Sequence, residues 1–487
     1  MNYELLFDAA AGKTVALAII GVAGFNHSLF YYAARSDRLS IRVLCGRDVH
    51  KCVAAYRALG IAEDRIAVCE SYAAGMKAYQ AGLFLVFGDA LLAMRMPFDV
   101  VIEGTGKPEA AAAHVLAAIE NGKHVVMVSK ESDSVAGPLF ARKAREKGVV
   151  YSLAEGDQPS LLIGLYTWAR TAGLTVLSIG KASEYDFIYD PKTGSMCVNG
   201  EEIAVPDFDA VWALGEDCRA TLARRSQMLS AVKQRAIPDL TEMGIVLNHL
   251  EGFAPDVPAF YCPIARAVEI PDLMCAERDG GIFADNGRID VVNLLRREDE
   301  QSLCGGVYVV VACDDETTWR VLKEKGVPVS RNGKTALVYY PAHYLGFEAI
   351  FSILSCALLG MPTSTRHPRP RYDVVARVTA PLRRGTVFTA QGHHHEIAAL
   401  EGILLPAEPI AGNSRLPFYL ADGTRLKCDV RPGQLLTADM LDIPGDPLLW
   451  KLRREQDALF FTCEFEGARA PNFPQNEGVT CNNLPRS

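Results

Sequence analysis

A glycine-containing turn, Ile19–Ser28, follows an apolar run near the start of the sequence. Gly21, Ala23 and Asn26 hold the three places of a dinucleotide-binding turn, and Gly24 adds a glycine between them. Small residues at these places permit a tight bend and let the backbone approach a pyrophosphate group. Ala23 keeps that approach fairly close, and Asn26 can cap a helix or adopt a left-handed conformation. The alternative is a turn that binds nothing.

The end of the second apolar run indicates which dinucleotide the turn would bind. Gly46 stands where NAD-binding proteins carry an acidic residue for the ribose hydroxyls, and Arg47 follows it. An arginine binds a 2′-phosphate through paired hydrogen bonds, so NADP is favoured and NAD stays possible. We expect Asp48 to cap the next helix. The alternative for Arg47 is a solvated side chain at a strand end.

A third polar segment, Glu103–Glu109, follows a later apolar run. Thr105 and Gly106 lie in this segment, at the carboxyl end of an expected strand. Ligands of open α/β sheets bind at that edge, so both residues are candidate cofactor contacts. The alternative is a simple loop before a helix that begins with Pro108.

The elements that must position these segments alternate between apolar strands and helical patterns. This alternation is typical of right-handed βαβ units, so residues 1–156 are predicted to form a Rossmann domain with a doubly wound parallel sheet. The predicted strands are 14–20, 40–44, 100–102, 124–128 and 149–152, and the predicted helices are 49–59, 109–121 and 137–146.

After residue 156 the pattern changes, and an α+β substrate and dimerisation domain is predicted for 157–362. Its predicted helices are 158–172, 219–234 and 239–250, and its strands are 175–180, 307–312 and 336–340, with a polar stretch before 209. The aperiodic, basic segment Thr363–Arg371 is predicted to be a linker. Short strands and turns then indicate a small β-rich domain, 373–465, and a loose tail, 466–487.

Composition excludes several classes of function. The 487 residues are 49% hydrophobic and 22% charged with a net charge of −8, which is typical of globular proteins and gives no attraction to nucleic acid or anionic membranes. The apolar stretch Thr14–Ala23 is too short to span a bilayer. Thirteen cysteines without a CxxC pair give no zinc or disulfide framework, so we expect reduced thiols and a cytoplasmic location.

Long runs of the sequence resemble homoserine-dehydrogenase-like oxidoreductases that carry a C-terminal SAF domain. The runs are VVIEGTGKPEA (Val100–Ala110), AIENGKHVVMVSKESD (Ala118–Asp133), VVYSLAEGDQPSLL (Val149–Leu162), YYPAHYLGFE (Tyr339–Glu348) and RLPFYLADGTRLKCDVRPGQLLTADML (Arg415–Leu441). The last run resembles the SAF module itself. The resemblance covers roughly residues 14–454 and includes enzymes similar in activity to deoxyxylulose-phosphate reductoisomerase.

The resemblance implies roles for residues in two of these runs. Ser129 and Lys130 match the strand-end segment beside the nicotinamide, where a lysine can polarise a carbonyl or alcohol oxygen. Asp157 matches the family's GDQP turn at the edge of the cleft. It would be a general acid/base or accept a hydrogen bond from a substrate hydroxyl; alternatively it caps the helix that begins at Pro159.

The sequence also departs from the family. Where relatives have a DGTK segment, this chain has Arg235–Pro238, so Pro238 replaces the lysine. Asp239 and Glu242 follow at a spacing of three, which places both carboxylates on one helix face. They either serve the active site or only cap and solvate the helix.

Two segments of the sequence contain histidines that could take part in chemistry. His343, in YPAHYLGFE, is interpreted as a core histidine of a helix at the domain junction. The run His393–His395 offers ligands for a metal, but consecutive side chains point in different directions, so we expect no metal there.

The leading hypothesis is an NADP-dependent oxidoreductase that transfers a hydride between nicotinamide and a small polyhydroxylated or phosphorylated carbonyl or alcohol compound. The alternative enzyme is a reductoisomerase of the deoxyxylulose-phosphate type in isoprenoid biosynthesis, which would need a divalent metal held by carboxylates. The missing lysine favours a third hypothesis, a sensor or scaffold that binds NADP without turnover. The family resemblance implies a homodimer or a higher homo-oligomer.

Overall fold

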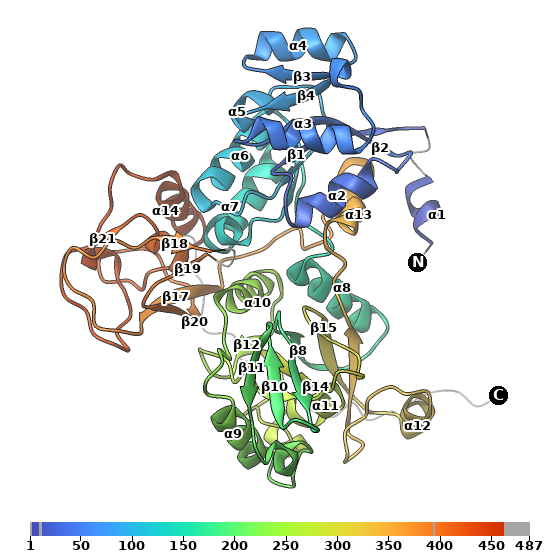
Figure 1. Ribbon diagram of the computed structural model, residues 1–487, viewed down its shortest axis with the longest axis vertical. Coiled ribbons are helices and arrows are strands. Elements are labelled where there is room, and N and C mark those ends of the chain that lie inside the picture. The colour runs from blue at the N-terminus through green and yellow to red at the C-terminus, as the bar shows by residue number, and fades with distance from the viewer. Residues whose placement is uncertain (1, 9–11, 393–394, 462–487) are drawn as a thin grey trace, which may run out of the picture.

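The computed structural model describes residues 2–8, 12–392 and 395–461. Figure 1 shows three bodies: a Rossmann domain, a central domain below it, and a C-terminal module beside both. His393, His394 and the predicted tail 466–487 lie outside the described residues. Within the described ranges, no helix is both long and apolar enough to cross a bilayer.

A parallel sheet of seven strands forms the Rossmann domain, as the sequence predicts. Along the sheet the strand order is β3-β4-β2-β1-β5-β6-β7. The strands are β1 (Val15–Ile20), β2 (Leu39–Cys45), β3 (Ile66–Cys69), β4 (Phe84–Phe87), β5 (Val100–Glu103), β6 (His124–Met127) and β7 (Tyr151–Leu153). Because the strand order reverses between β1 and β5, their carboxyl ends flank the crevice where such sheets bind ligands. The short strands β3 and β4 were not predicted.

Helices cover both faces of this sheet. They are α2 (Phe25–Ala33), α3 (Val49–Ala58), α4 (Tyr72–Gln80), α5 (Ala90–Ala93), α6 (Pro108–Glu120) and α7 (Lys130–Lys147), with α1 (Tyr3–Asp8) before β1. Helix α7 begins seven residues earlier than predicted. Proline is uncommon in the interior of a helix, so Pro138 indicated a helix start near residue 137, whereas the helix continues through it. Lys130 is therefore the first residue of a helix of 18 residues.

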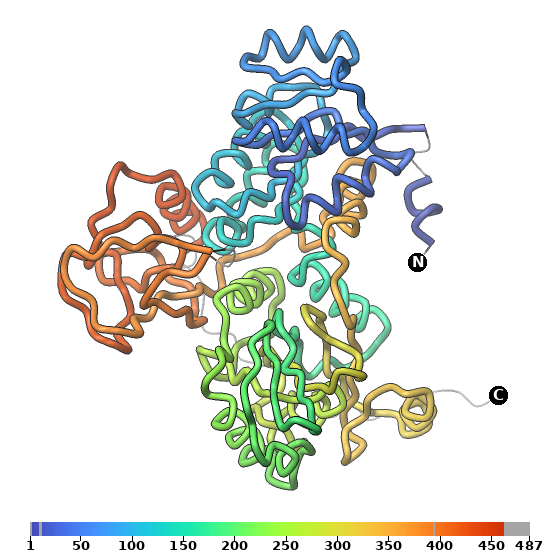
Figure 2. The backbone as a smooth tube through the Cα atoms, viewed as in Figure 1, coloured from blue at the N-terminus to red at the C-terminus, as the bar shows by residue number. Residues whose placement is uncertain are grey.

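The chain returns to the Rossmann domain after the central domain. Helix α13 (Ala349–Leu354) packs its apolar side chains into the core formed with β1 and β2. Figure 2 shows this segment rising from the central domain before the chain crosses to the C-terminal module. The central domain is thus inserted between parts of the Rossmann unit, as the sequence predicts.

A mixed sheet of nine strands forms the central domain. The strands are β8 (Val176–Ala182), β9 (Phe187–Asp190), β10 (Ser195–Val198), β11 (Glu201–Ala204), β12 (Ala254–Pro255), β13 (Ile264–Ala265), β14 (Arg288–Arg296), β15 (Val307–Ala312) and β16 (Thr335–Tyr340). The helices are α8 (Gln158–Thr171), α9 (Cys218–Met228), α10 (Ile237–His249), α11 (Ile270–Leu273) and α12 (Glu316–Glu324). The antiparallel strands β9–β11 occupy the stretch that was predicted to be merely polar.

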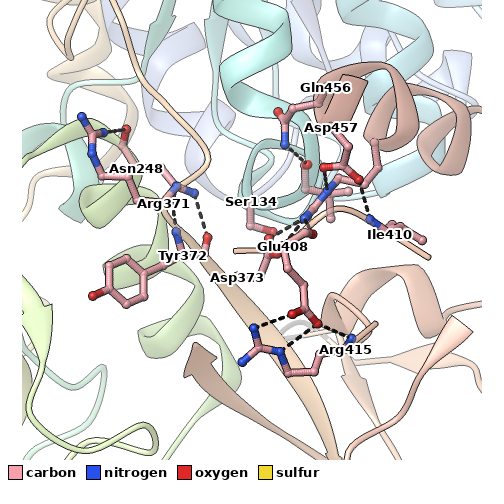
Figure 3. Close-up of polar contacts among 12 residues, drawn as sticks. Ser134, Asn248, Arg371, Tyr372, Asp373, Glu408, Ile410, Arg415, Gln456 and Asp457 are labelled. Atoms are coloured by element: carbon pink, nitrogen blue, oxygen red, sulfur yellow. Dashed lines mark hydrogen bonds and ion pairs between the residues drawn. The ribbon is translucent and has the colours of Figure 1, made fainter. Parts of the chain in front are cut away.

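The C-terminal module (residues 372–461) is built from short strand pairs and one helix. Its elements are β17 (Tyr372–Val378), β18 (Ala390–Gln391), β19 (Glu396–Ile397), β20 (Leu400–Pro406), β21 (Arg425–Leu426), β22 (Leu441–Asp442) and α14 (Leu448–Phe461). Figure 3 shows Asp373 and Asp457 in this module, and the Glu408 carboxylate turned toward Arg415. The fully buried Arg453 donates to both Asp373 oxygens (2.6 and 2.7 Å), to Asp457 (2.8 Å) and to the Glu408 backbone carbonyl (2.9 Å).

Helix α14 also joins the module to the Rossmann domain. The Gln456 side chain accepts a hydrogen bond from the Leu139 backbone N–H (3.2 Å) and donates to the Val135 carbonyl (3.0 Å). These two groups belong to the turn of α7 that contains Pro138. The module therefore contacts the helix that begins with Lys130.

The connecting segment Thr363–Arg371 has no regular structure, but it is not a loose linker. The Arg369 and Arg371 backbone N–H groups donate to Asn248 at the end of α10 (2.8 and 2.7 Å). The Thr365 hydroxyl is 2.8 Å from Nδ1 of the buried His249. These contacts hold the segment against the central domain, which composition alone did not indicate.

Candidate active site

A cavity of about 540 Å³ lies at the carboxyl ends of β1, β5 and β6. Its walls come from the Rossmann domain, the central domain and the C-terminal module. The lining residues are Ala23, Gly24, Phe25, Gly104, Thr105, Gly106, Val128, Ser129, Lys130, Glu131, Asp157, Gln158, Lys181, Glu184, Pro238, Glu242, His343, Leu345, Gly392 and His395.

The turn after β1 is shaped to receive a pyrophosphate. Gly21 has a φ of 83° and Gly24 a φ of 55°, both in the left-handed region that favours glycine. Gly24 is the N-cap of α2, no side chain caps that helix, and its first turn holds no acidic residue. The His27 N–H donates to the Gly24 carbonyl at 3.1 Å, which leaves the backbone N–H groups of Phe25 and Asn26 for an anion. A Cβ built at Gly24 would meet nothing within 4 Å, so these residues fit a dinucleotide.

The Asn26 side chain is not a helix cap, and a contact between Asn26 and the cofactor stays a prediction. The buried side chain of Asn26 donates to the carbonyls of Ile20 and Gly21, both at 2.9 Å, and neither caps α2 nor lines the cavity. A Cβ at Gly104 would lie 2.5 Å from Asn26 Nδ2. The Asn26 side chain therefore lies between the ends of β1 and β5 and stabilises the turn. This position depends on three-dimensional packing, which the spacing of residues in the sequence does not specify.

Gly46 and Arg47 lie at the end of β2, outside the cavity. Arg47 is exposed there, while a Cβ at Gly46 would come within 2.9 Å of the Cys52 sulfur. Asp48 caps α3 by accepting from the Lys51 N–H at 3.3 Å, which confirms that prediction. Binding of a 2′-phosphate by Arg47 stays a prediction.

Thr105, Gly106 and Ser129 lie together on the cavity wall. The Ser129 hydroxyl accepts a hydrogen bond from the Gly106 backbone N–H at 2.8 Å. The Thr105 hydroxyl donates to the buried Glu103 carboxylate at 2.6 Å. These bonds fix the loop after β5 against the start of α7, so the loop presents its backbone to the cavity.

Four of the predicted catalytic residues meet at the central end of this cavity. The Lys130 ammonium donates to Asp157 Oδ1 at 3.1 Å and to Glu242 Oε1 at 2.6 Å. Glu242 and Asp239 share one face of α10, as their spacing predicts, and both are buried. Burial rules out a role that is only solvation of the helix. Asp157 also caps α8 through the Gln158 N–H at 3.0 Å, which confirms the capping role, while its role toward a substrate stays a prediction.

Lys181, on β8, is the member of the cluster that sequence reasoning missed. It is almost fully buried, donates to Asp239 Oδ1 at 2.8 Å, and forms an ion pair with Glu242. Pro238 lines the cavity where the family resemblance places a lysine. The sequence did contain a signal for Lys181, since a lysine directly follows the predicted apolar strand 175–180. A lysine at the end of a buried strand is rare unless it is paired, so its position indicates a carboxylate partner.

The electrostatics of the cluster are set by two ammonium and three carboxylate groups. Burial opposes the charge of Lys130, but Asp157 and Glu242 outweigh it and raise the pKa of Lys130 well above its ordinary value. Burial would raise the pKa of Glu242, yet Lys130 and Lys181 hold it at about 2. Burial raises the pKa of Asp239 despite the neighbouring Lys181. Lys130 is thus a permanently charged donor facing the cavity.

His343 lies in a loop and not in the predicted helix. It is half-buried, lines the cavity, and its Nδ1 is 3.1 Å from the Gly305 carbonyl. The next element is only a short 3₁₀ turn, η5 (Leu345–Phe347), which packs against α2 through a Gly346 N–H bond to Ser28. The apolar pattern of this segment comes from that contact and from α13.

The donor set of the cluster does not fit a divalent metal. Among the described residues, no group of three or more His, Cys, Asp or Glu side chains is arranged to hold one. Asp157, Asp239 and Glu242 each accept from a lysine ammonium, which occupies oxygens that a metal would need. Two of the three histidines in the run His393–His395 lie outside the described residues.

Comparison with known families indicates an oxidoreductase, which agrees with a cavity that joins a glycine turn to a charged cluster. Residues 53–152 match the NAD-binding domain of homoserine dehydrogenase, and residues 156–349 match the catalytic domain of the oxidoreductase DRL. No curated protein matches the chain.

Solved structures resemble parts of the chain. A DOX-P reductoisomerase in complex with NADPH, fosmidomycin and magnesium shares 21% identity (TM-score 0.27) over 37% of this chain and 48% of that protein. Biliverdin reductase from Synechocystis sp. PCC 6803, in complex with biliverdin and NADP+, shares 17% identity (TM-score 0.24) over 36% and 47%. The chain therefore covers less than half the length of each.

Proposed function

We propose that this oxidoreductase uses NADP to transfer a hydride to or from a small polyhydroxylated or phosphorylated carbonyl or alcohol compound. The observation that carries the proposal is that the glycine turn after β1 and the Lys130 cluster line one cavity. The dinucleotide, when bound, supplies the hydride donor or acceptor. The remaining chemistry falls to the side chains at the central end of the cavity.

In this proposal Lys130 stabilises the negative oxygen that develops as a carbonyl is reduced. Asp157 and Glu242 hold its ammonium group in place, at 3.1 and 2.6 Å. A fixed charge beside a developing oxyanion acts mainly in the transition state and needs no reorganisation. Because the Lys130 pKa is raised, the ammonium stays charged at neutral pH and donates a hydrogen bond without giving up its proton.

The surroundings of the cavity support a polar or anionic substrate. The first turns of α2, α7, α8 and α10 all reach it, through Phe25, Lys130, Gln158 and Pro238. Helix N-termini favour negative charge, so a phosphorylated compound fits in addition to the cofactor's own phosphates. Arg47, exposed at the end of β2, supports NADP over NAD.

The two alternatives are less well supported. A reductoisomerase that depends on a divalent metal needs free carboxylates, whereas the three in this cluster accept from lysines. A binding protein without turnover was suggested by the lost lysine, but Lys181 provides a second ammonium group beside Glu242. We further propose that residues 373–465 are a SAF domain, which their short strand pairs support, and that the protein is a cytoplasmic homodimer or larger homo-oligomer.

The experiment is a screen in which NADPH oxidation is followed with free and phosphorylated hydroxyaldehydes and hydroxyketones of three to five carbons. Each reaction is run after dialysis against EDTA and again with added Mg²⁺. We expect turnover of at least one compound without added metal. Strict dependence on Mg²⁺ would favour the reductoisomerase, and NADPH binding without oxidation of any compound would favour the sensor.

A further inference from the structure

One wall of the cavity comes from the C-terminal module. His395 lies directly before β19, and only about a tenth of its side chain is exposed. Its Nδ1 is 2.6 Å from Oε1 of Glu131, a residue 264 positions earlier in the first turn of α7. A Cβ at Gly106 would lie 2.8 Å from Cε1 of His395, so the ring sits against the loop after β5.

The backbone at His395 is in an uncommon conformation. Its φ is 47°, in the left-handed region that few residues other than glycine occupy, although histidine does so more often than most, as asparagine and aspartate do. Such outliers cluster at functional sites, where the surrounding structure over-determines them. A second contact fixes the same module beside the cluster, since the Tyr419 hydroxyl is 3.4 Å from Thr241 Oγ1 on α10.

The proposed reaction needs a group that exchanges the proton of the substrate oxygen. Lys130 and Lys181 are each held by two carboxylates, and Glu242 is held between the two lysines. An imidazole is the side chain best suited to exchange protons near neutral pH. His395 has Nδ1 engaged by a carboxylate, which leaves Nε2 as the nitrogen for exchange and fixes which nitrogen carries the proton in the neutral ring.

We propose that His395 is the general acid/base of this cavity, supplied by the C-terminal module and oriented by Glu131. The inference rests on the proposed oxidoreductase function. In reduction, the hydride forms the new C–H bond, the carbonyl π electrons move to oxygen, and the Nε2 proton moves to that oxygen. The imidazolium becomes a neutral imidazole and regains a proton from water. In oxidation of the alcohol, Nε2 takes the proton.

Several other charged or titratable groups face the same cavity and can contribute to the pH dependence of the reaction. They are Lys130, Glu131, Asp157, Lys181, Glu184, Glu242 and His343. Glu131 is the one in contact with the His395 ring among the described residues. The other histidine of the cavity, His343, has its Nδ1 3.1 Å from the Gly305 carbonyl and interacts electrostatically with Glu348.

The first experiment measures the pH profile of turnover for the full-length protein, using NADPH and the best compound of the hydroxyaldehyde and hydroxyketone panel. We expect His395→Ala to lower kcat roughly 10²- to 10⁴-fold. The fall in turnover with rising pH that marks deprotonation of the general acid should also disappear in this variant. Added imidazole should restore part of the rate, while the exposed control His367→Ala behaves like wild type. Wild-type rates and an unchanged profile in His395→Ala would overturn the proposal and leave the oxidoreductase function standing. An inert wild-type protein would instead remove the proposed function.

The second experiment needs neither cofactor nor substrate. Side-chain ¹⁵N NMR of histidine-labelled protein reports which ring nitrogen of neutral His395 carries the proton, with His395→Ala used to assign the signal. In the wild-type protein we expect the neutral His395 ring to carry its proton on Nδ1. In Glu131→Ala we expect this preference for Nδ1 to be lost. A neutral ring protonated on Nε2 in wild type would overturn the assignment.

Discussion

The Lys130 ammonium lies 2.6 Å from Oε1 of Glu242, although the two residues are 112 positions apart in the chain. Lys130 begins a helix of the Rossmann domain, and Glu242 lies on α10 of the central domain. Their ion pair therefore crosses the domain boundary at the point where the cavity narrows onto the cluster. The charged centre of the site exists only when the two domains pack together.

Lys130→Ala should reduce hydride transfer far more than it reduces cofactor binding. Removing one donor to a developing oxyanion typically costs about 10²- to 10³-fold in rate. Single-turnover oxidation of NADPH measures the rate, and fluorescence titration measures affinity. Lys147→Ala, at the exposed end of the same helix, is the matched control and should be near neutral. Equal rates in both variants would show that Lys130 has no part in the chemistry.

NADPH should bind more tightly than NADH, and Arg47 should account for the difference. A charge-assisted pair with the 2′-phosphate contributes about 1.5–3 kcal/mol, or roughly ten- to a hundredfold in affinity. Titration of both cofactors against Arg47→Ala tests this, with the exposed Arg57→Ala on α3 as control. If NADPH and NADH bind equally, before and after the substitution, Arg47 lies outside the cofactor site.

Acid should weaken the junction between α10 and the connecting segment through His249. Burial, together with the Arg371 guanidinium, lowers the pKa of His249 to about 3. Below about pH 6.5 the unfolded chain binds a proton at His249, whereas the folded protein keeps His249 neutral. The stability that follows from the lowered pKa of His249 is therefore complete above about pH 6.5 and is lost as the pH falls toward 3. Between pH 6.5 and 5.5 the free energy of unfolding should fall by about 1 kcal/mol from this group alone.

Urea unfolding at a series of pH values measures that slope. His249→Gln, which does not titrate, should flatten it by about 1 kcal/mol per pH unit over this range. His367→Gln, an exposed histidine of the same segment, should leave it unchanged. A slope that is identical in wild type and His249→Gln would mean that His249 is charged in the folded protein.

Gln456→Leu should destabilise the contact between α14 and α7. It leaves the Leu139 N–H and the Val135 carbonyl without the partner that Gln456 provides, at a cost of about 1–3 kcal/mol for a buried unsatisfied group. The free energy of unfolding measures the loss. Lys451→Gln, which breaks only an exposed ion pair with Asp446, should change it by less than about 1 kcal/mol. If Gln456→Leu leaves the free energy of unfolding unchanged, the Leu139 N–H and the Val135 carbonyl must bond to each other within α7.

The sequence predicted those parts of the molecule whose signals are local. Runs of mostly apolar residues located β1, β2 and β5, and the spacing of Asp239 and Glu242 placed both carboxylates on one helix face. The strands β3 and β4 were not predicted, although β5 and β6 are equally short and were. The hairpin strands β9–β11 were missed because polar residues lie within and between them.

The rest of the site depends on contacts that no local pattern encodes. Lys181 joins the cluster only because β8 passes beneath α10, and His395 reaches the cavity from a different body of the protein. Asn26 had the right position for a cofactor contact, yet its amide turns to the carbonyls of β1. Spacing identifies which residues lie near one another along an element, whereas packing decides which way each side chain points.

The insertion of Gln456 into the turn of α7 has a consequence for how the protein is made. Leu139 and Gln456 are 317 positions apart, so at about 5–20 residues per second a ribosome needs roughly 15–65 s to synthesise the second after the first. During that interval the Rossmann domain can already fold and bind a dinucleotide, while the helix that begins with Lys130 still lacks its bridging amide. A nascent chain would thus acquire its cofactor crevice well before its catalytic helix is complete.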